Sequence, residues 1–296
     1  MSSDKRTSAS NAAKVFIRLL PLLIPFVLLF LGGLGMAVVQ SLGFFLPVKT
    51  TGGPFSAYTA LLQPHFIQSA LFSLWVALAS TTLSVTIGAV LAYAIWQMPH
   101  KLSRLSVVYK IPLILPHISV AFIVLIFWSQ SGVFASLAYQ FGFIDAPAEF
   151  PPVIHSGLGL GMILAYVLKE VPFVIILTLA VLRRLDPRLI QTATMLGSSP
   201  VSTFRSVALP HMKPALHTAG IILFLYGFGA FDIPFLLSES SPGMLSMEVY
   251  NLFFRRDLVN RPIAMAILVC MFLFSLAFIV IYTRIASRLD EGERKL

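Results

Sequence analysis

The sequence contains few charged residues, and this shortage limits the class of protein it can form. Only 11% of its 296 residues are Asp, Glu, Lys or Arg, whereas 57% are hydrophobic. Soluble globular domains carry roughly a quarter charged residues, so this chain has too little polar surface to cover a water-soluble globule of its length. The composition therefore predicts a protein whose solvent is mainly the lipid bilayer.

The sequence also lacks the residue clusters that metal binding, redox chemistry and catalysis require. Cys270 is the only cysteine, so an intrachain disulfide and a cysteine metal cluster are excluded. The six histidines are scattered, without an i, i+4 pair or neighbouring carboxylates. No nucleophile, base and orienting group share one region, and G-x-x-x-x-G-K-[ST] is absent. We expect no enzyme activity, no metal and no cofactor bound by this chain.

The net charge of +9 does not indicate nucleic acid, because of where the basic residues occur. They form short groups beside apolar runs and never an aromatic-studded basic surface. Membrane topology explains this distribution, so we expect lipid and no nucleic acid among the partners.

Six stretches are long enough to cross the bilayer, which takes about 20 mainly apolar residues for ~30 Å of hydrocarbon. The first is longer than the apolar region of a secretory signal and lacks an A-x-A site, so we interpret it as a retained span. The predicted spans are residues 16–39, 66–96, 111–129, 154–182, 214–238 and 263–286. We therefore predict an all-α polytopic membrane protein with about six transmembrane helices.

The basic residues predict the orientation of these spans. With the N-terminus in the cytoplasm, 16 Lys and Arg residues lie on the inner side and 4 on the outer side. The positive-inside rule therefore favours both termini in the cytoplasm. Arg255, Arg256 and Arg261 fit least well, although Asp257 and Glu248 accompany them.

The segment between the fourth and fifth predicted spans carries the signals of two short helices. Asp186 suits the N-cap of the first helix and Pro187 its first position, while Gly197 suits the left-handed residue that ends it. Ser199 and the proline after it repeat the start signal. The second helix is expected to end near Leu209, because a proline follows. We predict a cytoplasmic helix-turn-helix.

Each short helix has an apolar stripe at helical spacing. The stripes consist of Leu189, Ala193 and Leu196 on the first helix, and Val201, Phe204 and Ala208 on the second. A stripe of this kind is compatible with a plain connector that lies on its own spans or on lipid headgroups. For an arbitrary loop the plain connector is the favoured interpretation, and docking to another protein is the alternative.

One motif in this segment distinguishes the two interpretations. The stretch Gln191-Thr-Ala-Thr-Met-Leu-Gly197, followed by Phe204 and Val207-Ala-Leu-Pro210, closely resembles the EAA loop of binding-protein-dependent ABC importer permeases. The resemblance covers about residues 66–284, including the proline-rich Ile111-Pro-Leu-Ile-Leu-Pro116 and Lys169-Glu-Val-Pro-Phe173. Two positions depart from the family pattern: Gln191 replaces a glutamate and Thr192 replaces an alanine.

The resemblance implies a permease subunit with several partners in a bacterial inner membrane. The loop would dock on a dimer of ATP-binding subunits, which would hold ATP and Mg, and a periplasmic binding protein would deliver the solute. One loop per chain against two docking grooves requires a second permease, and a different chain is favoured. The implied coupling residues are Leu189, Gln191, Thr192, Ala193, Leu196, Gly197, Phe204 and Pro210.

The resemblance also predicts the domain organisation. Residues 1–65 would hold the cytoplasmic tail, the first span and a periplasmic loop, and residues 66–284 the permease domain. Residues 285–296 would form a charged cytoplasmic tail.

Three ionisable residues lie within the predicted spans, where charge is costly. Lys169 and Glu170 occupy the fourth span and, as sequence neighbours about 100° apart on a helix, should have separate partners. Asp232 lies near the outer end of the fifth span. Glu170 and Asp232 are candidates for the translocation path, with helix contacts or a helix-end cap as the structural alternatives.

A secondary transporter driven by an ion gradient is the alternative function. It would use the intramembrane charges and usually has two related halves, but the sequence shows no internal repeat, and such a transporter has no use for the Gly197 loop. The substrate is less defined: the resemblance slightly favours permeases for polyamines, ferric iron or small organophosphorus compounds.

Overall fold

The secondary structure is helical wherever the chain is described. The computed structural model describes residues 15, 17–46, 52–99, 105–154, 156–239 and 241–293, and these contain helices, turns and loops but no strand. A helix satisfies its backbone polar groups internally, as hydrocarbon requires. The predicted all-α fold is confirmed.

Among the residues that the structure describes, five helical stretches are long and apolar enough to span a bilayer. They are Ile17–Ser41, Pro64–Gln97, His117–Gln140, Leu160–Leu182 and Leu258–Ala286. They correspond to the first four and the last of the predicted spans. The third begins at His117 rather than at residue 111, and the fourth begins at Leu160 rather than at residue 154.

The predicted fifth span, residues 214–238, is not one helix. Helix α12 (Leu209–Gly229) ends before Ala230, which takes an extended conformation, and α13 (Asp232–Leu237) follows. Within a continuous helix, the ring of Pro234 would clash with the carbonyl of Ala230, four residues earlier. The prediction missed this break because both sides of it are apolar.

The chain consists of two compact units, each built from segments that are far apart in the sequence. The first contains residues 1–63 and 249–273. Its helices are η1 (Phe26–Leu31), α2 (Gly32–Ser41), α3 (Ser56–Ala60), η5 (Asn251–Arg255), η6 (Leu258–Asn260) and the first part of α15 (Arg261–Glu293). Within this unit the Ser41 and Tyr58 hydroxyls are 2.7 Å apart, and the rings of Phe30 and Phe272 are in edge contact.

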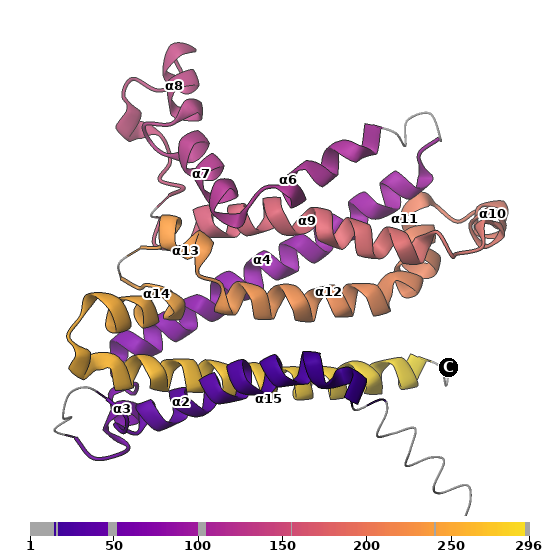
Figure 1. Ribbon diagram of the computed structural model, residues 1–296. Helices are drawn as coiled ribbons and strands as arrows, with labels where there is room; N and C mark the ends of the chain where they lie inside the picture. Colours follow the sequence, from indigo (N-terminus) through magenta and orange to yellow (C-terminus); the bar gives the residue numbers. More distant parts are fainter. Residues whose placement is uncertain are drawn as a thin grey trace, which may run out of the picture. The chain divides into compact units, whose positions relative to one another are not determined.

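The second unit contains residues 64–248 and 274–296. Its principal helices are α4 (Pro64–Gln97), α9 (Leu160–Leu182) and α12. The shorter helices before α9 are η2 (Leu105–Lys110), α6 (Ile111–Ile114), α7 (His117–Trp128), α8 (Val133–Gln140) and η3 (Pro147–Glu149). Those after α9 are α10 (Pro187–Met195), α11 (Pro200–Thr203), η4 (Phe204–Ala208), α13 and α14 (Leu245–Tyr250). Helices α4, α9 and α12 pack along one another (Figure 1). A Cβ at Gly88 would lie 2.5 Å from Cβ of Val174, so only glycine permits this approach of α4 to α9.

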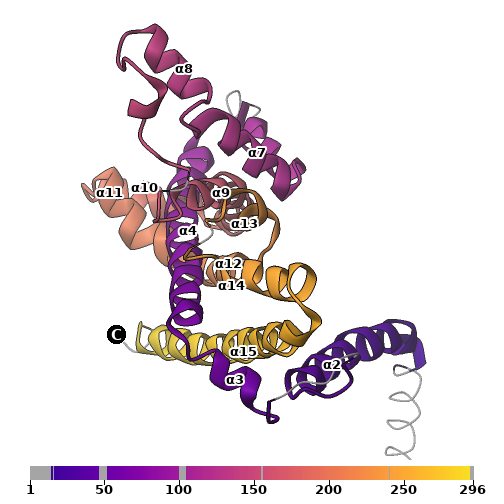
Figure 2. The same ribbon diagram turned by 90° about the vertical axis from the view of Figure 1, so that its left-hand side faces the viewer.

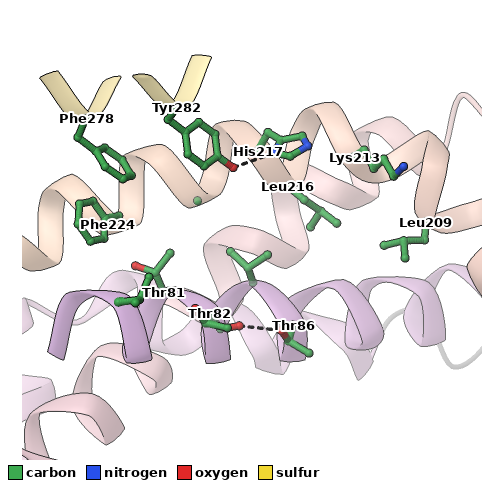
Figure 3. A pocket seen from close by; sticks show the side chains of 13 residues that line it. Thr81, Thr82, Thr86, Leu209, Lys213, Leu216, His217, Phe224, Phe278 and Tyr282 are labelled. Atoms are coloured by element: carbon green, nitrogen blue, oxygen red, sulfur yellow. Dashed lines mark hydrogen bonds between the residues drawn. The ribbon is translucent and has the colours of Figure 1, made fainter. Parts of the chain in front are cut away.

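Two buried clusters stabilise α9 at its two ends. Met162 and Tyr166 belong to a cluster with residues of α4, α7 and α13, whereas Leu179 and Leu182 pack with Tyr93 of α4 and neighbouring residues. On the side of α12 that faces α15, His217 Nδ1 lies 2.7 Å from the hydroxyl of Tyr282 in α15 (Figure 3).

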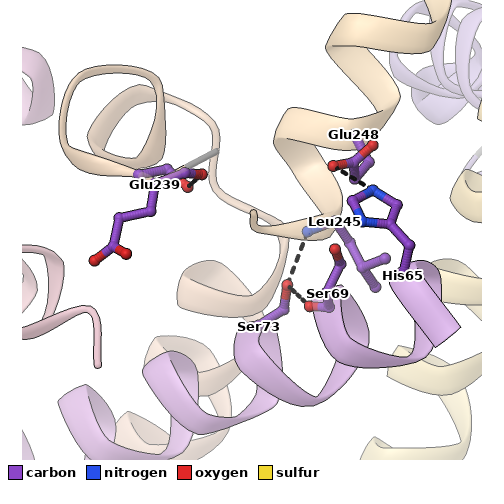
Figure 4. Close-up of polar contacts among 7 residues, drawn as sticks. His65, Ser69, Ser73, Glu239, Leu245 and Glu248 are labelled. Atoms are coloured by element: carbon purple, nitrogen blue, oxygen red, sulfur yellow. Dashed lines mark hydrogen bonds and ion pairs between the residues drawn. The ribbon is translucent and has the colours of Figure 1, made fainter. Parts of the chain in front are cut away.

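Polar contacts tie α14 to the start of α4 (Figure 4). The Leu245 N–H donates to Ser73 Oγ at 2.8 Å, and His65 Nε2 lies 3.0 Å from Oε1 of the buried Glu248. The segment that contains α10 and α11 lies beyond the C-terminal end of α9 in Figure 1, and it projects to one side of α4 and α9 in Figure 2.

Candidate functional site: the α10–α11 loop and the polar middle of α9

The first short helix forms as its capping residues predict. Asp186 accepts a hydrogen bond from the Arg188 N–H at 2.9 Å, and Pro187 occupies the first turn of α10. Gly197 follows the helix with φ +82°, a left-handed conformation that favours glycine. Both ends of α10 are therefore defined by the residue types that the sequence provides.

The second short helix starts as predicted but ends differently. Ser199 accepts a hydrogen bond from the Ser202 N–H at 3.2 Å, which begins α11. The helix then passes through the π-helical η4 directly into α12, so the prediction that it ends near Leu209 is wrong. The wider π-helical turn relieves the clash between the Pro210 ring and the preceding turn.

The tip of this loop presents apolar side chains at its surface. Leu189 is 52% exposed, Met195 87% and Leu196 82%. Of the other predicted coupling residues, Gln191, Thr192 and Gly197 are exposed and Ala193 is partly buried. An exposed apolar group of this kind is typical of a protein contact surface.

The base of the loop is packed against the helices. The ring centroids of Phe204 and Tyr93 are 5.0 Å apart, and Ala208 is fully buried near Met212. Outside the membrane spans, burial raises the pKa of the Tyr109 hydroxyl, while Arg183 acts in the opposite direction. The loop thus combines an exposed tip with a fixed base.

The buried Lys169 has a structural partner. Its Nζ donates to the carbonyl oxygens of Pro112 and Leu113 at 2.9 Å each and of Leu115 at 2.5 Å. Helix α6 ends there, because Leu115 takes an extended conformation before Pro116. Lys169 satisfies carbonyl groups that the break in the helix leaves without partners.

Glu170 points to a different neighbour, as predicted for adjacent helical positions. Ser84 of α4 donates a hydrogen bond to Oε2 of Glu170 at 3.1 Å. Glu170 is 3% exposed, and its Oε1 has no hydrogen-bond partner among the described residues. One oxygen of this carboxyl group is therefore bonded within the chain, and the other is buried without a hydrogen-bond partner among the described residues.

Asp232 lies in the first turn of α13, exposed, directly after the break that follows α12. Tyr226 is within electrostatic range of both Asp232 and Glu170. The fully buried Tyr166 is in ring contact with Tyr226, whose ring also lies 4.8 Å from that of His117. The two candidate carboxylates thus share one polar region, and the Tyr166 hydroxyl is buried there without a partner among the residues described.

Sequence reasoning missed Ser84, the two tyrosines and His117. A signal for Ser84 was present, because Ser73, Ser80, Ser84 and Gly88 recur at helical spacing along one buried face of α4. Such a face of small residues permits close helix contact and hydrogen bonds in a membrane. The tyrosines gave no comparable signal, since aromatic residues are common throughout the spans.

Comparison with known proteins identifies the family to which residues 84–291 belong. Residues 84–291 match the family model described as "Binding-protein-dependent transport system inner membrane component". The spermidine/putrescine permease PotB of Escherichia coli is 28% identical over 186 residues, which are 61% of this chain and 64% of PotB. The molybdenum permease ModB of Azotobacter vinelandii is 24% identical over 231 residues, which are 77% of this chain and 96% of ModB.

The chain spans about three fifths of the length of two Brucella permeases that it also matches, 60% of one and 57% of the other. Among solved structures, a bacterial ABC transporter that imports the acidic polysaccharide alginate has a chain with a TM-score of 0.78 and 21% identity. That match covers 97% of this chain and 99% of the other. At this identity it shows a common fold.

Proposed function

The chain belongs to the binding-protein-dependent transport system inner membrane component family, and we propose that it carries a small cationic solute through an ATP-driven importer. A periplasmic binding protein delivers the solute, and separate ATP-binding subunits that dock on the α10–α11 loop supply the energy. Both termini and this loop face the cytoplasm, in agreement with the 16 to 4 distribution of basic residues.

The observation that carries this proposal is the exposed apolar tip on a fixed base. Met195 and Leu196 are more than four-fifths exposed at the tip, whereas Phe204 packs on Tyr93 at the base. The helix that starts at Pro200 continues through η4 and α12 to Gly229. A displacement at the loop is therefore passed along α12 to the break next to Asp232.

The partners follow from this arrangement. An ATP-binding dimer offers two equivalent docking sites, and each permease chain provides one loop. A second permease subunit completes the importer, and a different chain is favoured. ATP and Mg bind to the ATP-binding subunits, because this sequence contains no phosphate-binding loop.

The polar region supports a cationic substrate. It contains two carboxylates, Glu170 and Asp232, and two tyrosine rings, while the amino group of Lys169 is held by three carbonyl groups. Carboxylates and aromatic faces both attract organic cations. A polyamine is the first candidate, because PotB is named for spermidine and putrescine, although a relative named for molybdenum transport shows that family membership alone leaves the solute open.

Purification of the tagged chain from its native membrane in mild detergent tests the proposal. We expect ATP-binding subunits carrying G-x-x-x-x-G-K-[ST] and a permease partner in stoichiometric amounts, with ATP hydrolysis by the complex. A chain that purifies without an ATPase, and that transports in vesicles under an ion gradient alone, would instead be a secondary transporter.

A further inference from the structure

A groove of about 570 Å³ lies between α4, α12 and the second half of α15 (Figure 3). Most of its lining is apolar, with Leu78 and Val85 from α4, Phe224 from α12 and Phe278 from α15. The polar side chains Lys213, His217 and Tyr282 also line it. An apolar groove with basic and hydroxyl groups suits an amphipathic ligand better than a purely apolar one.

The contacts between α12 and α15 show where the polar end of the groove lies. His217 pairs with Tyr282, and Phe224 stacks on Phe278 with ring centroids 4.2 Å apart. Residue numbers rise along one helix while they fall along the other, so the two helices are antiparallel. Lys213, one turn before His217, is therefore level with the residues one turn after Tyr282.

This level coincides with the end of the membrane span. The apolar span of α15 ends at Ala286, four residues after Tyr282. Tyrosine is enriched at membrane–water interfaces, where its ring and hydroxyl meet different environments. The ammonium group of Lys213 thus belongs to the depth of the lipid headgroups, and Arg284, an exposed residue of α15, provides a second cation near this level.

The apolar part of the groove has the length of a lipid chain. Lys213 and Phe224 both line the groove, and their 11-residue separation on a helix corresponds to roughly 16 Å. One leaflet contributes about 15 Å of hydrocarbon, so an acyl chain fits along this surface. Thr82 and Thr86 on the α4 side are exposed, which leaves the groove open to the bilayer.

We propose that this groove binds an anionic phospholipid, with its phosphate at Lys213 and one acyl chain between α4 and α12. The site is distinct from the polar region around Glu170 and does not depend on the transported solute. Because α12 is continuous with η4 and α11, the bound lipid stabilises the helix that leads to the α10–α11 loop.

Native mass spectrometry of the full chain in mild detergent, with equal amounts of phosphatidylglycerol and phosphatidylcholine added, tests the proposal. We expect wild-type chain to retain phosphatidylglycerol preferentially. Lys213→Gln should reduce its retention about fivefold, the value of one basic residue at an anionic surface. Lys213→Arg should preserve it, and Lys110→Gln, an equal charge change outside the groove, should have no effect.

Gly220→Leu tests the groove itself. A Cβ at Gly220 would lie 3.8 Å from the Tyr282 hydroxyl, an ordinary contact, so the backbone accepts a side chain that then fills the groove. We expect this variant to lose both lipids and Gly220→Ala to keep them. Unchanged phosphatidylglycerol retention in Lys213→Gln and Gly220→Leu would overturn the proposal. A loss of permease dimers with Gly220→Leu, without a loss of lipid, would also overturn it, because a second permease would then occupy the groove.

Discussion

The α10–α11 loop and the middle of α9 both place side chains in energetically unfavourable environments, but in opposite ways. The loop exposes apolar residues, with Leu196 at 82% exposure, whereas α9 buries ionisable residues, with Glu170 at 3%. Exposed apolar surface favours contact with a partner, and buried charge requires internal partners. Each region therefore departs from the usual distribution of side chains, and in each the departure indicates a role.

The two regions also differ in how far their side chains find contacts within the chain itself. Lys169 has three acceptors within the chain, and its role is accounted for by the broken helix that it stabilises. The loop tip, Met195 and Leu196 above all, is exposed in this chain by itself. Glu170 lies between these cases, because one of its oxygens is bonded and the other is not.

The largest expected effect comes from Gly197→Asp. At φ +82° a side chain costs roughly 1 to 2 kcal/mol, about a tenfold shift away from the dockable conformation, and the new charge also opposes apolar docking. We expect normal insertion but loss of ATPase binding and of coupled transport. Membrane level, co-purification and uptake are measured together.

Gly142→Asp is the matched control for this variant. Gly142 also has positive φ, and at both glycines a Cβ would meet open space, so the two substitutions impose similar backbone strain. We expect Gly142→Asp to retain ATPase binding. Equal loss of coupling in both variants would show that general strain, and not the docking surface, causes the defect.

The second largest expected effect is a loss of stability in a variant of Lys169. Lys169→Met removes three hydrogen bonds and leaves partly buried carbonyl groups without donors, so the free energy of unfolding should fall by about 3 kcal/mol. Lys110→Met, at an exposed lysine, should change it by less than about 0.5 kcal/mol. Chemical denaturation in detergent measures both. If Lys169→Met is as stable as the wild type but transports poorly, Lys169 belongs to the path instead.

The variants at Gly197 and Lys169 also show which features of the structure could be predicted from the sequence. The caps of α10 depend on local chemistry at Asp186, Pro187 and Gly197, so the order of residues along the chain was sufficient. The partner of Lys169 is more than 50 residues away at a break in α6, and no local pattern specifies that pairing.

The breaks themselves were the weakest part of the sequence-based prediction. Leu115 and Ala230 interrupt stretches that are apolar on both sides, so hydrophobicity alone predicted continuous spans. At Pro210 the opposite error occurred, because a π-helical turn allows the helix to continue through a proline. In each case the outcome depends on how the backbone groups around the proline find partners.

The smallest expected effects belong to the two carboxylates. Glu170→Gln and Asp232→Asn preserve shape while removing a negative charge, worth about 1 kcal/mol toward a nearby cation in water, or about fivefold in polyamine uptake. Asp257→Asn, at an exposed residue outside this region, should leave uptake unchanged. Unaltered rate and selectivity in both variants, with normal assembly, would assign Glu170 and Asp232 to structure.

Cross-linking at the loop tip tests coupling most directly. A chain with Cys270→Ser and Met195→Cys carries its only thiol at a residue that is 87% exposed, and Phe143→Cys provides the same for a loop predicted to face the opposite side. In purified complex with a thiol-reactive bifunctional reagent, we expect the residue 195 variant to join the ATP-binding subunit, with a yield that changes when ATP is added. Two results would contradict the account. One is a cross-link from residue 143, and not from residue 195, to the ATP-binding subunit. The other is an active complex in which residue 195 forms no cross-link either with or without ATP.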